Sequence, residues 1–118
     1  MVLLCGGYIL TNEQVLLFAE KLNLTVRNKD LPSIIVNGYY TRRGIGKPFI
    51  GVTFEDEFYN IWVTQAKHDG KLLVDPDYEK FEEREYDLGL KRNFERIGIV
   101  GVRYVTVADP YCHAPEYD

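Results

Sequence analysis

The chain has 118 residues, of which 46% are hydrophobic, 14% aromatic and 27% charged. This size and balance fit one globular domain and exclude disordered, collagen-like and low-complexity proteins. Fourteen Lys and Arg against eighteen Asp and Glu leave a net charge of −4, which argues against bulk attraction to nucleic acid or acidic membranes. No apolar run approaches the roughly 20 residues that a membrane helix needs, so we expect no membrane association.

The N-terminus and the cysteines indicate an intracellular protein. No basic residue precedes the first apolar stretch, which is about four residues long, whereas a secretion signal needs about 7–15. We therefore expect Met1 to be a genuine start and the protein to be cytoplasmic. Its two cysteines are Cys5 and Cys112. Two reduced thiols are expected in that compartment, and a disulfide between them is the alternative.

The clearest local pattern predicts a helix that begins after Thr11. Thr11 and Gln14 have the spacing of a capping box, in which each side chain bonds the backbone amide of the other residue. Asn23 is the expected C-terminal cap. Between them, apolar residues recur with helical spacing at Val15, Phe18, Ala19 and Leu22.

Two short strands are predicted near this helix and further along the chain. Residues 2–5 form the first, with Gly6-Gly7 as the bend that leads into the helix. Residues 49–54 form the second, which ends at the acidic turn 55–57.

Two hairpins are also predicted. In the first, Asn37-Gly38 joins residues 33–36 to residues 39–41, because Asn-Gly supplies the positive φ angles of a type I′ turn. In the second, residues 59–67 are rich in strand-forming side chains, residues 68–71 form the turn, and the chain returns over 72–74.

A second helical region is predicted from Asp75-Pro76-Asp77 to about residue 97. Its acidic residues come first and its basic residues last, a polarity that opposes the helix dipole favourably. The apolar stripe changes face near Gly89. We therefore expect a kink or two shorter helices at that point.

The last core element predicted is a strand at residues 98–107. Both of its faces are apolar, which is typical of a central strand covered on two sides, or of one paired in an oligomer. Residues 109–118 form an extended C-terminal arm. The prediction is one α+β domain over residues 1–118, with a mainly antiparallel sheet, an N-terminal helix and a kinked C-terminal helical region.

The most suggestive stretch for binding is the basic, glycine-containing segment 39–49. Its candidate anion ligands are Arg42, Arg43 and Lys47. Glycine backbone amides together with Arg and Lys suit an anion, and aromatic residues among basic ones can stack bases. The spacing is not that of a phosphate-binding Walker loop. A solvated connection, a small anionic ligand and nucleic acid are the three interpretations, in that order.

Arg103 is the fourth candidate for holding an anion. By strand alternation it shares a face with Ile99, Val105 and Val107, so its guanidinium would lie in or beside the core. A buried guanidinium needs a partner. That partner is either an internal carboxylate or an anionic ligand in a pocket.

Catalytic candidates are few. His68 occupies the predicted hairpin turn, and Tyr104 is a tyrosine that could transfer a proton. Cys112 and His113 are adjacent, but neighbouring side chains of an extended chain point apart. A thiol–imidazole pair would therefore need Cys5 with His113, or Cys112 with His68. No spacing of these residues suits zinc, and we expect neither metal nor cofactor.

The nine tyrosines and one tryptophan are the main sign of an interaction surface. Tyrosine and arginine are enriched at protein interfaces. The candidate contact residues are Tyr39, Tyr40, Trp62, Tyr111 and Tyr117.

Two functions follow, and the sequence does not decide whether the protein is an enzyme. The leading hypothesis is a small cytosolic interaction or regulatory protein that binds another macromolecule, as a homodimer. The alternative is a small enzyme or ligand-binding protein for an anionic or aromatic molecule, with Arg anchors and Tyr or His proton transfer. A tyrosine-lined cavity near Arg103 would favour the alternative, and a flat exposed aromatic surface the leading hypothesis.

Overall fold

The computed structural model describes residues 3–54, 57–68 and 79–109. Its sheet has the strand order β2-β3-β1-β4, and every neighbouring pair is antiparallel. The strands are β1 (Leu3–Leu10), β2 (Phe49–Phe54), β3 (Glu57–His68) and β4 (Arg103–Asp109). The helices are α1 (Asn12–Lys21), α2 (Pro32–Thr41) and α3 (Glu85–Arg96). The predicted α+β class is confirmed, and no helix in the described ranges is both long and apolar enough to span a membrane.

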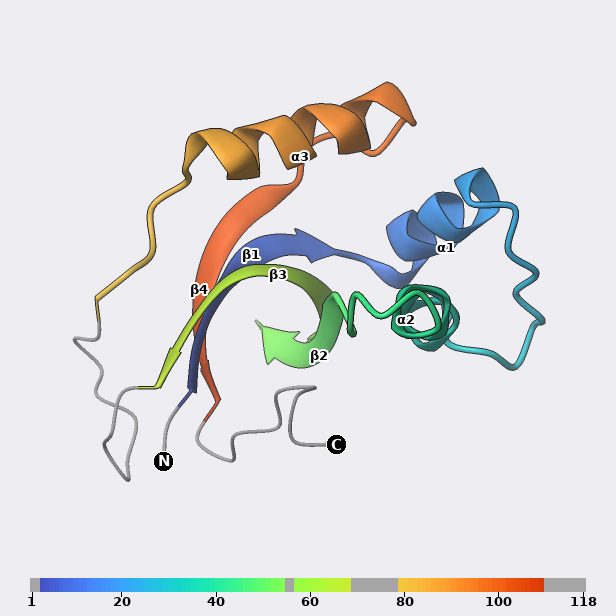
Figure 1. Ribbon diagram of the computed structural model, residues 1–118, viewed down its shortest axis with the longest axis horizontal. Helices are drawn as coiled ribbons and strands as arrows, with labels where there is room; N and C mark the ends of the chain where they lie inside the picture. Colours follow the sequence, from blue (N-terminus) through green and yellow to red (C-terminus); the bar gives the residue numbers. More distant parts are fainter. Residues whose placement is uncertain (1–2, 55–56, 69–78, 110–118) are drawn as a thin grey trace.

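The three helices pack on one face of the sheet. Figure 1 shows α1 and α2 side by side at one end, with α3 apart from them. The main core lies between the helices and this face, and includes Tyr8, Leu10, Val15, Val36 and Phe94. A smaller apolar cluster around Leu3 and Cys5 lies on the opposite face. We call these the helix face and the opposite face.

Strand β1 is twice as long as the predicted strand, and Gly6-Gly7 is not a bend. All of its residues are buried, because β3 pairs on one side and β4 on the other. A Cβ at Gly7 would collide with the carbonyl oxygen of Trp62, and one at Gly6 would lie 2.8 Å from Phe81 Cδ2. Both glycines therefore serve close packing rather than a turn.

Helix α1 begins and ends as predicted. The Gln14 amide donates to Thr11 Oγ1 at 3.2 Å, and the Thr11 amide donates to Gln14 Oε1 at 2.9 Å. Asn23, directly after the C-cap Leu22, has a positive φ of 59°, the conformation in which asparagine ends helices. Local chemistry alone fixes both ends of this helix.

The hairpin predicted around Asn37-Gly38 is wrong, because this segment is helix α2. Pro32 lies in the first turn, where its missing amide costs little. Val36 is buried and Tyr40, one turn later, packs against the same core. Asn37 bonds both the amide and the carbonyl of Phe49, at 2.9 and 3.0 Å. Tertiary packing and this side-chain bridge outweigh the local turn signal.

The strand at 49–54 is confirmed as β2, and it pairs with β3 as a hairpin. Strand β3 contains the predicted strand 59–67. His68, predicted to begin the turn 68–71, is the last residue of β3. The rest of that turn, its return strand 72–74 and most of the acidic turn 55–57 lie outside the described residues.

Helix α3 is shorter than predicted and continuous through Gly89. It begins at Glu85, and residues 79–84 are not helical. The buried Asp87 and Phe94 and the half-buried Leu90 follow one straight stripe toward the core. Since Gly89 lies away from that stripe, it needs no kink.

Strand β4 is an edge strand of the described sheet, which corrects the predicted central position. It begins only at Arg103, because Gly98 and Gly101, with φ of 93° and 75°, turn the chain before it. Within the strand the predicted alternation is found: Tyr104 faces the helices, and Val107 packs on the opposite face. The predicted place of Ile99 on the face of Val107 is wrong, because Ile99 precedes the strand and is buried in the main core. The arm predicted for 109–118 lies beyond β4 and outside the described residues, apart from Asp109 itself.

Candidate functional site

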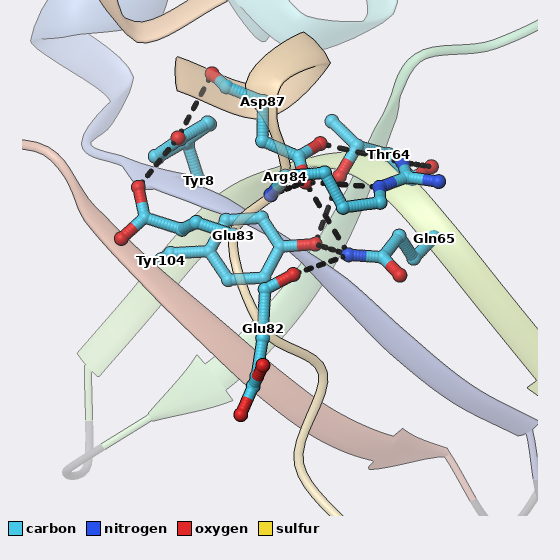
Figure 2. Close-up of polar contacts among 8 residues, drawn as sticks. All are labelled: Tyr8, Thr64, Gln65, Glu82, Glu83, Arg84, Asp87 and Tyr104. Carbon is cyan, nitrogen blue, oxygen red and sulfur yellow. Dashed lines mark hydrogen bonds and ion pairs between the residues drawn. The ribbon is translucent and has the colours of Figure 1, made fainter.

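A polar cluster joins the sheet to the segment that leads into α3 (Figure 2). The strands contribute Tyr8, Thr64, Gln65 and Tyr104, and the segment before α3 with its first turn contributes Glu82, Glu83, Arg84 and Asp87. These residues come from three strands and a loop far apart in the sequence. The cluster is therefore a product of the fold.

A β-bulge places two consecutive residues of β3 in the cluster. Gln65 pairs with Gly6 and Val63 with Gly7, so Thr64 between them is an extra residue with no pairing position on β1. Regular strands direct adjacent side chains to opposite faces. Here Thr64 Oγ1 and Gln65 Nε2 both contact the Tyr104 hydroxyl, at 2.9 and 2.7 Å.

Asp87 is the buried charge of the cluster. It has no exposed surface, and its Oδ2 accepts from the Arg84 amide at 2.8 Å and from Arg84 Nε at 3.2 Å. Burial alone would raise the pKa of Asp87, but hydrogen bonds from Arg84 and from the Thr64 hydroxyl outweigh it and lower that pKa. The carboxylate is therefore a charged structural acceptor that also begins helix α3.

Tyr8 is the second buried titratable group. Its hydroxyl lies 2.7 Å from Glu83 Oε2 and 2.9 Å from the Asp87 carbonyl oxygen. Burial, followed by the hydrogen bond to Glu83, raises the pKa of Tyr8 well above its ordinary value. The phenol stays protonated and acts as a donor, which suits anchoring rather than proton transfer.

Segment 79–84 is fixed to the sheet by further hydrogen bonds. The Phe81 amide donates to Thr106 Oγ1 at 2.9 Å. Gln65 Nε2 donates to the Glu82 carbonyl at 2.9 Å, and Arg84 Nη2 donates to the Thr64 carbonyl at 3.1 Å. With the Tyr8–Glu83 contact, these bonds hold four successive residues against the strands.

A cavity of about 490 Å³ lies between this segment and the sheet. Its described lining includes three cationic side chains, Lys67, Lys80 and Arg84, and two carboxylates, Glu79 and Glu82. Among the residues that the structure describes, neither Arg103 nor a tyrosine lines it. Its cations suit a small anion.

The predicted anion ligands Arg42, Arg43 and Lys47 are exposed around the end of α2. Arg43 lies with its guanidinium carbon 3.6 Å from the centre of the Tyr39 ring, and its Nη1 donates to the Tyr39 carbonyl at 3.2 Å. Gly44 and Gly46 have positive φ angles and serve turn geometry. Arg103, also exposed, belongs to β4 at the other edge of the sheet, so the four residues do not converge.

Two of the predicted contact residues are largely internal. Trp62 and Tyr40 both pack against the main core, with their ring centres 5.6 Å apart. Burial, followed by the neighbouring Tyr39, raises the pKa of Tyr40, while Arg43 opposes this shift. The rings of Phe18, Phe49 and Phe94 complete the surroundings of Trp62.

The predicted catalytic residues are not assembled into a site by the described structure. His68 is exposed at the end of β3, whereas Tyr104 is engaged with Thr64 and Gln65. Cys5 is buried in β1. The described residues contain no group of three or more His, Cys, Asp or Glu able to hold a metal ion. The remaining candidates lie outside the described residues: Tyr111, Cys112, His113 and Tyr117.

The exposed apolar surface is the feature that sequence reasoning missed. Among the described residues, the large exposed hydrophobic side chains are Leu31, Ile34, Ile45, Tyr86 and Val100. Leu31 and Ile34 lie three residues apart, on the side of α2 away from the core. Helical spacing could have revealed this stripe, but the hairpin prediction placed these residues in a strand.

Compared with protein-family models, with curated proteins and with solved structures, the chain shows no significant match.

Proposed function

We propose that this is a small interaction protein that binds another macromolecule through the outer face of α2, and that it works as a homodimer. The observation that carries the proposal is the exposed apolar stripe on α2. Ile34 is 62% exposed and Leu31 45% exposed, and Ile45 beyond the helix is 69% exposed. Exposed apolar patches rimmed by polar residues mark interaction sites.

The position of the stripe on the helix supports a docking surface. Leu31, Ile34 and Gly38 are spaced three and four residues apart and so follow one line along α2. Val36, on the reverse side, is buried in the core. The core therefore lies on the Val36 side of α2, and the outer side presents Ile34 and part of Leu31 to solvent.

The charges around the stripe indicate the chemistry of the partner. Arg42 lies over Gly38, because a Cβ at Gly38 would be 3.3 Å from Arg42 Nη1. Arg43 and Lys47 are exposed in the same connection. An apolar line that ends in three cations fits an amphipathic protein segment with acidic residues beside its apolar face.

The test is site-specific photo-crosslinking in the host cell. A photo-reactive amino acid replaces Ile34 in one variant and Glu20, an exposed residue of α1, in a matched control. We expect a defined protein adduct from position 34 and none from position 20. Added Arg42→Glu and Arg43→Glu should remove the adduct, because they reverse the charges that steer an acidic segment.

Two results would contradict the proposal. An adduct of equal yield at both positions would show unspecific contact. An adduct that consists of nucleic acid or lipid would show that the partner belongs to another class of molecule.

The cavity beside segment 79–84 favours a second candidate function, binding of a small anion. Lys67, Lys80 and Arg84 supply cations, and Phe81 supplies an apolar wall. Inorganic phosphate is the simplest probe. We expect it to raise the melting temperature of the natural chain but not of Lys67→Ala, while sodium chloride at equal ionic strength gives no such difference. Equal effects on both proteins would rule this candidate out.

A further inference from the structure

We propose that two copies of this chain associate edge to edge through their β4 strands, which pair antiparallel about a two-fold axis at Thr106. The inference rests on the homodimer in the proposed function and specifies its interface. This pairing joins two four-stranded sheets into one continuous sheet. It uses a surface separate from the α2 stripe, so the two surfaces can be tested independently.

Strand β4 is the outer strand of the described sheet, next to β1. A strand directs backbone amides and carbonyls to both of its sides, so one row of those of β4 points away from β1. Such an edge is a template for a further strand. Strand β4 suits this role, because its register with β1 is unbroken over seven residues and it contains neither proline nor lysine.

The opposite edge of the sheet, β2, is covered at its start by a side chain of α2. Asn37 accepts a hydrogen bond from the Phe49 amide at 2.9 Å and donates one to the Phe49 carbonyl at 3.0 Å. Pro48 directly before this strand and Gly51 within it weaken it further as a template. The comparison favours β4 as the edge that pairs.

Helix α3 packs toward the inner strands of the sheet. The ring centre of Phe94 lies 6.2 Å from that of Tyr8 in β1 and 5.7 Å from that of Trp62 in β3. A two-fold axis between two edge strands is perpendicular to the sheet, so the helices of both copies lie on the same face. Each set of helices then covers the inner strands of its own copy.

The sequence of β4 is self-complementary in this register. The axis places residues equally far before and after Thr106 opposite each other, and directly opposed residues share one face of a sheet. Val105 therefore lies opposite Val107 of the partner subunit. Tyr104 lies opposite Ala108 of the partner subunit, a large residue beside a small one. Each pair forms twice, because a two-fold interface repeats every contact.

Opposite charges occupy the two ends of the paired strands. The same axis places Arg103 opposite Asp109 of the partner subunit at each end. Opposite charges at paired positions stabilise a sheet, and an axis at Val105 or Val107 would remove both pairs. Within one chain Arg103 and Asp109 are about 20 Å apart along the strand, too far to pair with each other. This complementarity is the reason for choosing a second copy as the partner.

The first experiment measures sedimentation velocity of the full chain over a concentration series. A contact of seven residues per copy is small, so we expect a monomer–dimer equilibrium with a dissociation constant on the order of 1–100 µM. Arg103→Glu should weaken the dimer about 5- to 30-fold, because two attractive charge pairs become repulsive. Arg96→Glu, the same change at an exposed position of α3, should leave the equilibrium unchanged. A chain that stays monomeric throughout, or a dimer that tolerates Arg103→Glu, would overturn the proposal.

The second experiment tests the register by mixing two variants. Asp109→Arg alone should weaken the dimer as Arg103→Glu does, because each homodimer then holds two like-charge pairs. A mixed dimer of the two variants has opposite charges at both ends, so it should form with about the affinity of the natural chain. Native mass spectrometry distinguishes the mixed dimer by its mass. A mixture without preference for the mixed dimer would refute this register.

A third measurement locates the symmetry axis. In a Cys112→Ser background, Thr106→Cys should form a disulfide-linked dimer with oxidised glutathione, because directly paired residues have Cα atoms within reach of a disulfide. Ala108→Cys, on the same face of β4, should not, because the two copies of this position lie about 13 Å apart along the strands. Equal linkage at both positions would place the axis elsewhere and refute the pairing.

The two proposed surfaces fail separately. A chain that is monomeric yet still gives the photo-adduct at position 34 would refute this dimer and leave the α2 surface standing. A dimer that shows the expected charge dependence but gives no such adduct would support the β4 interface and refute the α2 surface.

Discussion

The hydroxyl of Tyr8 lies 2.7 Å from Glu83 Oε2, although 75 residues separate them in the sequence. The same hydroxyl contacts the Asp87 carbonyl at 2.9 Å. A residue of the central strand thus holds both the segment before α3 and the first turn of that helix. This contact connects the polar cluster to the core, since the Tyr8 ring packs edge-on against Tyr104 and Phe94.

Tyr8→Phe should lower the free energy of unfolding by about 1–2 kcal/mol at pH 7, because a buried acceptor loses its donor. The substitution keeps the ring and its packing, so the effect reports the hydroxyl alone. Urea denaturation followed by circular dichroism measures it. A change below about 0.3 kcal/mol would show that the hydroxyl does not anchor the segment.

The same variant has a signature at high pH. The pKa of Tyr8 is raised in the folded protein above its ordinary value of 10.0, so the unfolded chain loses this proton first. The stabilisation is complete below pH 10 and is lost as the pH rises above it. The natural chain should therefore lose stability more steeply than Tyr8→Phe between about pH 10 and 11. Parallel curves for the two proteins would contradict this assignment.

Asp87→Asn should lower the free energy of unfolding by about 1.5–3 kcal/mol at pH 7, the range for hydrogen bonds to a charged group. The pKa of Asp87 is lowered from its ordinary value of 3.8, so its contribution is present above that pH and is lost as the pH falls through the lower, folded value. Acid denaturation should therefore be less steep in the variant than in the natural chain.

Asp30→Asn is the matched control for Asp87→Asn. Arg27 and Asp30 have the same spacing, and Arg27 Nε lies 3.3 Å from Asp30 Oδ2, but Arg27 is 71% exposed. Solvent screens such a pair, and we expect a loss of less than about 1 kcal/mol. Equal losses in the two variants would mean that burial of Asp87 has no energetic consequence.

Gly7→Ala and Gly89→Ala should have opposite effects on stability. The added methyl group at Gly7 collides with the Trp62 carbonyl, so the pairing of β1 with β3 must shift, and we expect a loss of at least about 2 kcal/mol. At Gly89 there is room and alanine favours the helix, so we expect a gain of about 0.5–1 kcal/mol. Thermal unfolding at low protein concentration, where no dimer forms, compares them. A gain at Gly7 would show that the close approach is absent.

Arg43→Ala should leave the fold intact and weaken partner capture at position 34. Arg43 is exposed and its contacts are the ring and carbonyl of Tyr39, which contribute about 0.5–1 kcal/mol. The yield of the photo-adduct and its salt dependence should both fall. Arg92→Ala, which removes an exposed arginine from α3, is the control and should not change the yield. Unchanged capture by Arg43→Ala would remove the basic connection from the binding surface.

Elements with a complete local signal could be predicted from the sequence. Thr11 and Gln14 satisfy each other within one turn, so α1 needs no distant contact to define its start. The turn signal of Asn37-Gly38 is equally local, yet this segment forms helix α2 instead of a hairpin. Asn37 instead bonds the backbone of Phe49, twelve residues away, and no local pattern contains that information.

The candidate site could not be predicted for the same reason. Gln65 and Asp87 meet at 3.3 Å only because a bulge turns one toward the helices and a helix start buries the other. Arg103 shows the converse: its strand alternation was predictable, but its exposure depends on β4 lying at the sheet edge. Strand order and register are properties of the whole chain.

The extra residue Thr64 determines which face of the sheet each later side chain of β3 points to. Trp62 faces the helices, and in an unbroken alternation Thr64 and Ala66 would follow it there, while Gln65 and Lys67 would face away. With the bulge, Gln65 and Lys67 reach the cavity instead. Deleting Thr64 would make the alternation regular, with Trp62, Gln65 and Lys67 still on one face, but would remove a hydroxyl from the polar cluster. The extra residue therefore brings two successive side chains of β3 to the same hydroxyl, which a strand without a bulge cannot do.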